Sequence, residues 1–138
     1  MKKIILIFVI GLVVSCQQSI TQTDLQFLNG YWEIEKVELP DGDKKEYKVN
    51  ETIDFFKISD NKGFRTKVMP QLDGTYLTNT IKEDIVISLE NRKATIQYKT
   101  KYASWNEEIL ELSKDKLIVK NQQDLEYHYK RPVKFSIK

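Results

Sequence analysis

Residues that commonly carry out catalysis are scarce in this sequence. It contains one cysteine, Cys16, and one histidine, His128, in 138 residues. A nucleophile–base pair or a zinc centre needs several such side chains together. Adjacent acids such as Glu107 and Glu108 would point to opposite faces of a strand, so they do not form a catalytic pair. We therefore predict no catalytic residue, no metal site and no cofactor, with a calcium site on a turn such as Asp60-Asn61 left as an alternative.

Cys16 follows an apolar segment at the start of the chain. Met1-Lys2-Lys3 is basic, and the apolar run over residues 4–14 is far shorter than the roughly 20 residues that a membrane-spanning helix needs. Val13-Val14-Ser15-Cys16 is similar to a bacterial lipobox, whose cysteine is acylated and becomes the mature N-terminus. We predict a signal peptide over residues 1–15 and lipidation at Cys16. The alternative is an ordinary signal peptide with an incidental cysteine.

Lipidation at Cys16 would have two consequences. Acyl chains such as palmitate would anchor the protein to a membrane, and residues 16–23 would form a flexible tether. The whole chain has 22 basic and 20 acidic residues, and removal of Lys2 and Lys3 with the signal peptide leaves 20 of each. A nucleic-acid partner requires a concentrated basic face, so this charge balance argues against one.

The remaining sequence, residues 24–138, has the pattern of one all-β domain. Short segments of alternating polar and apolar residues are separated by turn signals, of which the clearest lie at residues 40–43, 60–63 and 73–74. The segment over residues 93–102 is typical, because Ala94, Ile96 and Tyr98 share one face and lysines occupy the other. Phe64, Thr66 and Val68 are expected to face inward in the same way.

Two positions are expected to bring the first and last strands together. The short helical run Asp24-Leu25-Gln26-Phe27-Leu28 precedes Gly30, which can adopt a positive φ, and Trp32 then begins the first strand. Arg131 shares a face with Tyr127 and Tyr129 on the last strand, so its charge points inward and needs a partner. A guanidinium stacks well on an indole, so we predict that Trp32 and Arg131 form a structural clasp.

These features resemble a known family. Leu28-x-Gly30-x-Trp32 resembles the entry motif of the lipocalins, and more closely that of the small lipocalin-like lipoproteins of Bacteroidetes-type bacteria. In lipocalins an arginine or lysine near the end of the last strand packs over the motif tryptophan, and Tyr127-His128-Tyr129-Lys130-Arg131 is similar. The resemblance implies an antiparallel up-and-down barrel in the bacterial cell envelope. Because Gln17 is not the retention aspartate of that sorting pattern, it also implies the outer membrane.

The turn signals allow eight, nine or ten strands. The count depends on whether residues 44–59 and 74–90 each form one bent strand. If Trp32 and Arg131 lie at the same end of a meander, the number of strands must be even, which excludes nine. The turns near Asp41, Ala103 and Gln123 then lie at the opposite end, which we expect to be the mouth. Bulges are expected near residues 34–37 and 55–56, where the alternation changes phase.

The mouth is the expected ligand site. If Leu110 and Leu112 face inward, the alternation also turns Asn106 and Glu108 inward, and Trp105 lies out of phase on the rim. The predicted ligand-binding residues are Tyr98, Tyr102, Asn106, Glu108 and Tyr127. Tyrosine faces and one carboxylate suit a small, partly apolar molecule with a polar or cationic group. The alternative is a filled barrel that binds another envelope protein or has a structural role.

Overall fold

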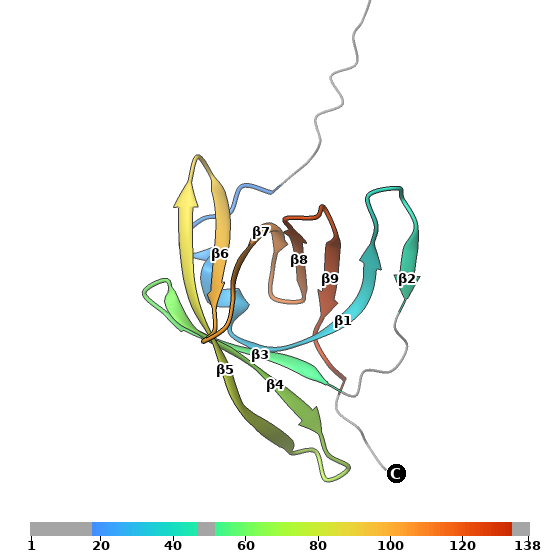
Figure 1. Ribbon diagram of the computed structural model, residues 1–138. Coiled ribbons are helices and arrows are strands. Elements are labelled where there is room, and N and C mark those ends of the chain that lie inside the picture. Colours follow the sequence, from blue (N-terminus) through green and yellow to red (C-terminus); the bar gives the residue numbers. More distant parts are fainter. Residues whose placement is uncertain (1–17, 47–51, 134–138) are drawn as a thin grey trace, which may run out of the picture.

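The computed structural model describes residues 18–46 and 52–133, which form nine strands, and tight turns join successive strands within each of these two ranges (Figure 1). Two of these turns consist of consecutive residues with positive φ, Asp60-Asn61 and Asn91-Arg92, a conformation that matches the right-handed twist of a hairpin. The strands are β1 (Gly30–Glu38), β2 (Lys44–Glu46), β3 (Ile53–Ser59), β4 (Lys62–Pro70), β5 (Tyr76–Glu90), β6 (Lys93–Lys99), β7 (Ser104–Leu112), β8 (Lys116–Asn121) and β9 (Glu126–Lys130).

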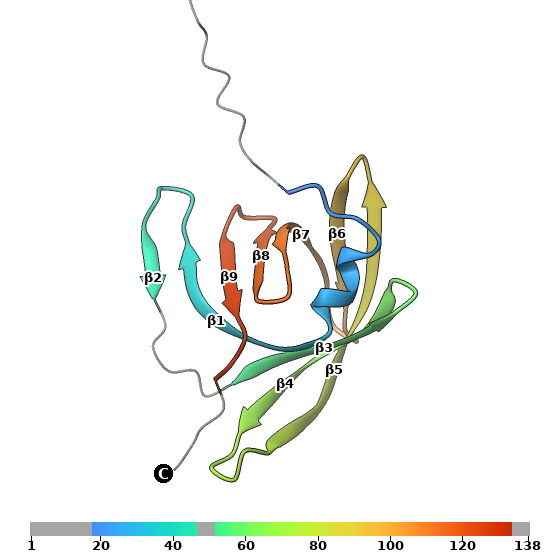
Figure 2. The ribbon, with the colours of Figure 1, turned by 180° about the vertical axis from the view of Figure 1, so that it is seen from behind.

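Eight of these strands form a closed antiparallel ring. β1 pairs with β3 on one edge, β3 to β9 follow in sequence order, and β9 returns to pair with β1 (Figures 1 and 2). The short strand β2 pairs only with the last residues of β1 and lies outside the ring. The all-β barrel prediction is therefore confirmed. The described residues form nine strands, a number that the sequence argument excluded. The ring itself still contains an even number of strands, because β2 does not take part in it.

Register shifts decide which side chains face the interior. The shift between Ile34 and Lys36 on β1 confirms the bulge expected there. The bulge expected at residues 55–56 is wrong, because β3 pairs with β4 without a shift along its whole length. β7 contains a shift that we did not expect, between Ile109 and Glu111. Each such shift interrupts the alternation of inward and outward side chains. Residues on one side of the shift therefore lie on the face opposite to the one that regular alternation from the other side predicts.

The barrel wall is apolar on both faces around β3 and β4. Phe56 belongs to the interior core, whereas Phe55 on the other face packs against Tyr31 and Phe64, with ring centroids 4.8 and 6.3 Å away. Phe64, Thr66 and Val68 share a face as expected, but it is this outer face. Their predicted orientation is wrong because aromatic neighbours on the outside can bury apolar residues as well as the core can. Arg65 therefore points into the barrel.

The closed end is covered by the segment that precedes β1. The 3₁₀ turn η1 (Asp24–Leu28) buries Leu25 and Leu28, and Trp32 donates its indole N–H to the Leu28 carbonyl at 2.9 Å. Ile20 is also buried, at 3% exposure, in the core. Within the predicted tether, Gln18 is hydrogen-bonded to Leu112 and Ile20 is buried, whereas residue 19 and residues 21–23 are exposed.

Several sequence predictions lie outside the described residues. These are the signal peptide over residues 1–15, Cys16, and the last five residues of the predicted domain. Among the residues that are described, no helix is long and apolar enough to span a membrane.

Candidate functional site

The predicted partners at the closed end, Trp32 and Arg131, are in contact. The guanidinium carbon of Arg131 lies 3.6 Å from the centroid of the Trp32 ring. Its nitrogens donate to three carbonyl oxygens, those of Phe27 at 2.7 Å, Tyr31 at 3.0 Å and Lys114 at 2.8 Å. Arg131 thus connects η1, β1 and the β7–β8 turn. Each guanidinium nitrogen donates to a backbone carbonyl, an arrangement that suits a structural role.

A cavity of about 320 Å³ lies toward the other end of the barrel, where the β8–β9 turn forms part of its rim. This volume is at the small end of the range for ligand sites. Its lining side chains are Ile34, Asp54, Arg65, Lys67, Trp105, Asn106, Glu107, Asn121, Gln122, Gln123, Tyr127 and Tyr129. The position agrees with the expected mouth.

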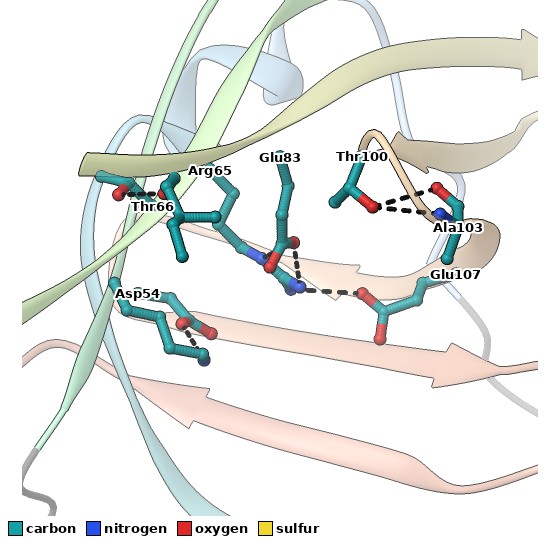
Figure 3. Close-up of polar contacts among 9 residues, drawn as sticks. Asp54, Arg65, Thr66, Glu83, Thr100, Ala103 and Glu107 are labelled. Carbon is teal, nitrogen blue, oxygen red and sulfur yellow. Dashed lines mark hydrogen bonds and ion pairs between the residues drawn. The ribbon is translucent and has the colours of Figure 1, made fainter. Parts of the chain in front are cut away.

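Arg65 is the central charge of this site (Figure 3). It projects inward from β4 and is only 8% exposed. Its Nε donates to Glu83 Oε2 on β5 at 2.8 Å, and its Nη1 lies 3.6 Å from Glu107 Oε1 on β7. The guanidinium also lies 4.2 Å from the ring centroid of Tyr98 on β6. Burial acts to lower the pKa of Arg65, but the surrounding oxygens raise it more, so the side chain is a permanent cation.

A second ion pair lies beside Arg65. Asp54 on β3 is almost fully buried and accepts a hydrogen bond of 2.7 Å from the ammonium of Lys67 on β4. Lys67 is half exposed at the side chain, so it reaches from the mouth inward to the carboxylate. Both cations of the cavity are thus held by carboxylates of the barrel itself.

Glu107 is a buried charged residue of this site with an oxygen that accepts no hydrogen bond. It is 6% exposed, and its Oε1 accepts no hydrogen bond. Burial raises the pKa of this carboxyl, although Arg65 opposes the change. The hydroxyl of Tyr98 makes no hydrogen bond of good geometry, but its contact with the Glu107 carboxyl also opposes the rise in the pKa of Glu107. Three carboxylates, Asp54, Glu83 and Glu107, face two cations, which leaves one negative charge in excess when all are ionised.

Aromatic rings form the apolar part of the site. Trp105 stacks on Tyr98 with ring centroids 5.3 Å apart and an interplanar angle of 14°, and its indole lines the cavity. Tyr127 and Tyr129 on β9 also line the cavity. The cavity therefore combines flat apolar surfaces with a few fixed charges, as small-molecule sites usually do.

The five residues predicted to bind a ligand are not brought together. Tyr127 lines the cavity, and Asn106 lies on its rim and also lines a second hollow on the outer wall. Tyr98 points inward but is fully buried behind Trp105. Tyr102 is 89% exposed, and Glu108 pairs with Thr95 and Lys120 on the outer face, so these two predictions are wrong. Trp105, expected only to influence entry from the rim, instead lines the cavity.

The β7 bulge explains most of these errors. Regular alternation from Leu112 and Leu110 turns Glu108 and Asn106 inward. Because the strand shifts register between Ile109 and Glu111, Ile109 and Glu107 face inward instead. The inward orientation predicted for Tyr102 is wrong for another reason. Strand β6 ends at Lys99, and the Thr100 N–H donates to the Ala103 carbonyl at 2.8 Å, so Tyr102 lies in a turn and not on the strand.

Sequence reasoning missed the five charged residues that complete the site. These are Asp54, Arg65, Lys67, Glu83 and Glu107. Arg65 and Lys67 alternate with apolar neighbours, which makes them look solvated when hydrophobicity alone assigns the inner face. The useful signal was Phe55-Phe56, because adjacent aromatics on a regular strand require both faces of the wall to be covered. When both faces of a strand are covered, both carry apolar residues, so hydrophobicity alone cannot identify the face that points into the barrel.

A further polar cluster lies on the outer wall. The ligand atoms of Glu38, Glu126 and His128 are within 4.8 Å of one another, a spacing compatible with a metal ion that the sequence did not lead us to expect. Glu38 is already paired with Lys36 at 3.3 Å and Lys44 at 3.8 Å, which opposes cation binding. His128 lies on the outer face of β9 but is only 8% exposed.

Comparisons with known proteins agree with this architecture. A family model described as a lipocalin-like domain matches residues 28–119. A lipocalin-like protein from Bacteroides uniformis is similar in structure, with a TM-score of 0.50 and 15% identity over 77% of this chain and 99% of that one. An uncharacterized protein from Bacteroides eggerthii gives a TM-score of 0.50 and 14% identity over 76% and 99% of the two chains. No curated protein matches the sequence.

Proposed function

Because the chain belongs to the lipocalin-like domain family, we propose that it is a binding protein, not an enzyme, and that it holds a small, partly apolar molecule in the mouth cavity. The observation that supports this proposal is the cavity of about 320 Å³ walled by Trp105 and Tyr127 and containing buried charges. A barrel of eight strands can be filled completely by its own side chains, so a cavity is not a necessary product of this fold.

Native mass spectrometry of the protein purified from its own cell envelope tests the proposal. We expect a small molecule to remain bound. The variant Trp105→Ala should lose it while still folding, because Trp105 is only partly buried and packs at the edge of the core. A measured mass equal to that of the processed chain alone, under conditions that preserve weak complexes, would contradict ligand binding.

We further propose that Cys16 carries the lipid that attaches this barrel to the envelope, on the outer membrane. The lipobox-like sequence Val13 to Cys16 supports this assignment. Changing Cys16 to serine should leave the precursor unprocessed or release the domain from membranes, as measured by fractionation and by the mass of the mature N-terminus. Equal membrane retention and equal mass in the two proteins would argue against lipidation.

The alternative function, binding of an envelope protein, is supported by a different surface. The β4–β5 hairpin projects from the barrel (Figure 1), and Met69, Leu72 and Leu77 near its tip are 43%, 74% and 54% exposed. A photo-crosslinking residue at position 72, compared with one at the exposed position 102, tests this function in cells. One defined adduct from position 72 that is lost in Leu77→Ser would favour a partner over an internal ligand.

A further inference from the structure

We propose that the molecule bound in the mouth cavity carries a protonated amine, which donates a hydrogen bond to Glu107. This inference rests on the proposed function and names the chemical class of its ligand. It differs from the site expected from the sequence, because Glu108 faces outward and the inward carboxylate is Glu107.

The cations of the cavity are already neutralised, which argues against an anionic ligand. Arg65 donates to Glu83 at 2.8 Å, and Lys67 donates to Asp54 at 2.7 Å. An anion would have to displace a carboxylate of the barrel from each cation. It would also enter a site that holds one more negative than positive charge when its acids are ionised. Like charges in such a poorly solvated site repel strongly.

Glu107, in contrast, has one oxygen that accepts no hydrogen bond. Its nearest cationic atom, Arg65 Nη1, is 3.6 Å from Oε1, beyond ordinary hydrogen-bond distance, and this oxygen has no other partner. Buried carboxylates are normally hydrogen-bonded, so an unmet acceptor on a residue that lines a cavity indicates where a ligand donor would lie once the carboxyl turns toward it. One ammonium group supplies both the donor and the missing positive charge.

The cavity wall next to Glu107 fits such a group. Trp105 lies two residues before Glu107 on the same face of β7, and its indole lines the cavity with Tyr127 opposite. The faces of these rings carry partial negative charge and attract cations. They also provide flat surfaces for an apolar body. An aromatic or aliphatic amine therefore matches the site better than a carboxylic acid of the same shape.

Matched probe pairs test this inference. Each pair has the same body and differs only in an amine or a hydroxyl: phenethylamine with phenethyl alcohol, tryptamine with tryptophol, and 2-naphthylmethylamine with 2-naphthylmethanol. We expect calorimetry at pH 7.5 to show at least one amine bound about tenfold more tightly than its alcohol. Glu107→Gln should reduce that preference to less than threefold. The control Glu108→Gln, one residue away on the outer face, should retain it.

The unmodified protein offers a second readout. Since burial raises the pKa of Glu107 above its ordinary value of 4.5, lowering the pH from 7.5 to 4.5 takes the solution below the folded pKa and should weaken amine binding, while alcohol binding stays constant. The amine itself stays protonated over this range. The groups facing Glu107 are Arg65 on β4, Glu83 on β5, Asp54 on β3, and Tyr98 and Tyr129 on β6 and β9. An amine preference as large at pH 4.5 as at pH 7.5 would assign the selectivity to another group and overturn the proposal.

The outcomes separate this inference from the proposed function. If no amine is preferred over its alcohol while the purified protein still retains a small molecule, the amine inference is wrong and the ligand-binding function stands. If neither preference nor retained molecule is found, both are wrong. The pH experiment needs no variant, so the inference stays testable even if Glu107→Gln folds poorly.

Discussion

Arg65 contacts two carboxylates that differ in what they contribute. Glu83 receives the Nε hydrogen bond of 2.8 Å and also contacts Nη2, so it is the main counter-ion of the guanidinium. Glu107 lies 3.6 Å away at its closest oxygen and leaves that oxygen without a hydrogen bond. The first carboxylate holds the barrel interior together. The second is buried at a cost that a ligand could offset.

This difference predicts opposite effects of the same substitution. Glu83→Gln removes the close partner of a buried cation and should lower the free energy of unfolding by roughly 3 kcal/mol. Glu107→Gln should leave it within about 1 kcal/mol of the parent or increase it at pH 7, because Arg65 keeps Glu83. Urea denaturation of both variants measures this. Equal losses would indicate that Glu107 is an ordinary structural partner.

The sign of the Glu107 effect follows from its raised pKa. The folded state holds the proton more tightly than the unfolded state, so stability falls as the pH rises from about 4.5 through the folded pKa. Above the folded pKa the full cost of the buried charge is present. The advantage of Glu107→Gln over the parent should therefore disappear toward pH 4.

The closed-end pair predicts a large loss of stability. Trp32→Ala should cost roughly 3 to 5 kcal/mol, because Trp32 is fully buried. Arg131→Ala should also destabilise, and Arg131→Lys should restore only part of the loss, since an ammonium cannot reproduce the three-carbonyl contact. Denaturation midpoints equal to that of the parent would refute the clasp.

At the scale of elements, a single register shift in β7 decides which residues form the site. The strand itself, its partners and its approximate ends follow from alternation and turn signals. The position of the bulge does not follow from these signals, because Leu110, which lies at the register shift, is apolar and would fit on either face. Pairing with β6 and β8 over the whole strand selects the bulge, and local sequence does not contain that information.

The junction between η1 and β1 makes a prediction of its own. Gly30 has φ +110°, and a Cβ there would lie 3.2 Å from Arg131 Nη1. Gly30→Ala should therefore destabilise the protein by roughly 1 to 3 kcal/mol, through backbone strain and displacement of the guanidinium. Gly42→Ala is the matched control, with φ +91° and no atom within 4 Å of the added carbon. Equal losses in the two thermal melts would assign the whole effect to φ.

For the whole molecule, closure was predictable and the interior was not. Trp32 and Arg131 lie near the two ends of the domain, and their types require them to meet, which makes the ring even-numbered and locates the mouth. The charged interior could not be predicted because aromatic residues such as Tyr31, Phe55 and Phe64 cover the outside of the wall. A sheet that is apolar on both faces gives hydrophobicity no means to distinguish its inside from its outside.

The outer wall predicts a pH dependence of global stability. Burial lowers the pKa of His128 below its ordinary value near 6.5, although Glu38 opposes the change. The unfolded chain then takes up the proton first, so this residue makes stability fall as the pH drops from 6.5 toward the folded pKa. His128→Gln should gain stability relative to the parent between pH 7.5 and 5.5 in urea denaturation. A constant difference between the two proteins would contradict this.

Gln18 determines how the barrel would be oriented on a membrane. Its side-chain amide donates to the Leu112 carbonyl at 3.0 Å and accepts from the Leu112 N–H at 2.9 Å, beside the β7–β8 turn. Only Gln17 separates it from Cys16, and two residues of chain reach at most about 7 Å. Acyl chains on Cys16 would therefore hold the floor of the barrel, with Arg131 and Lys114, against the lipid headgroups. The open end would face away from the bilayer, toward molecules arriving from the aqueous phase.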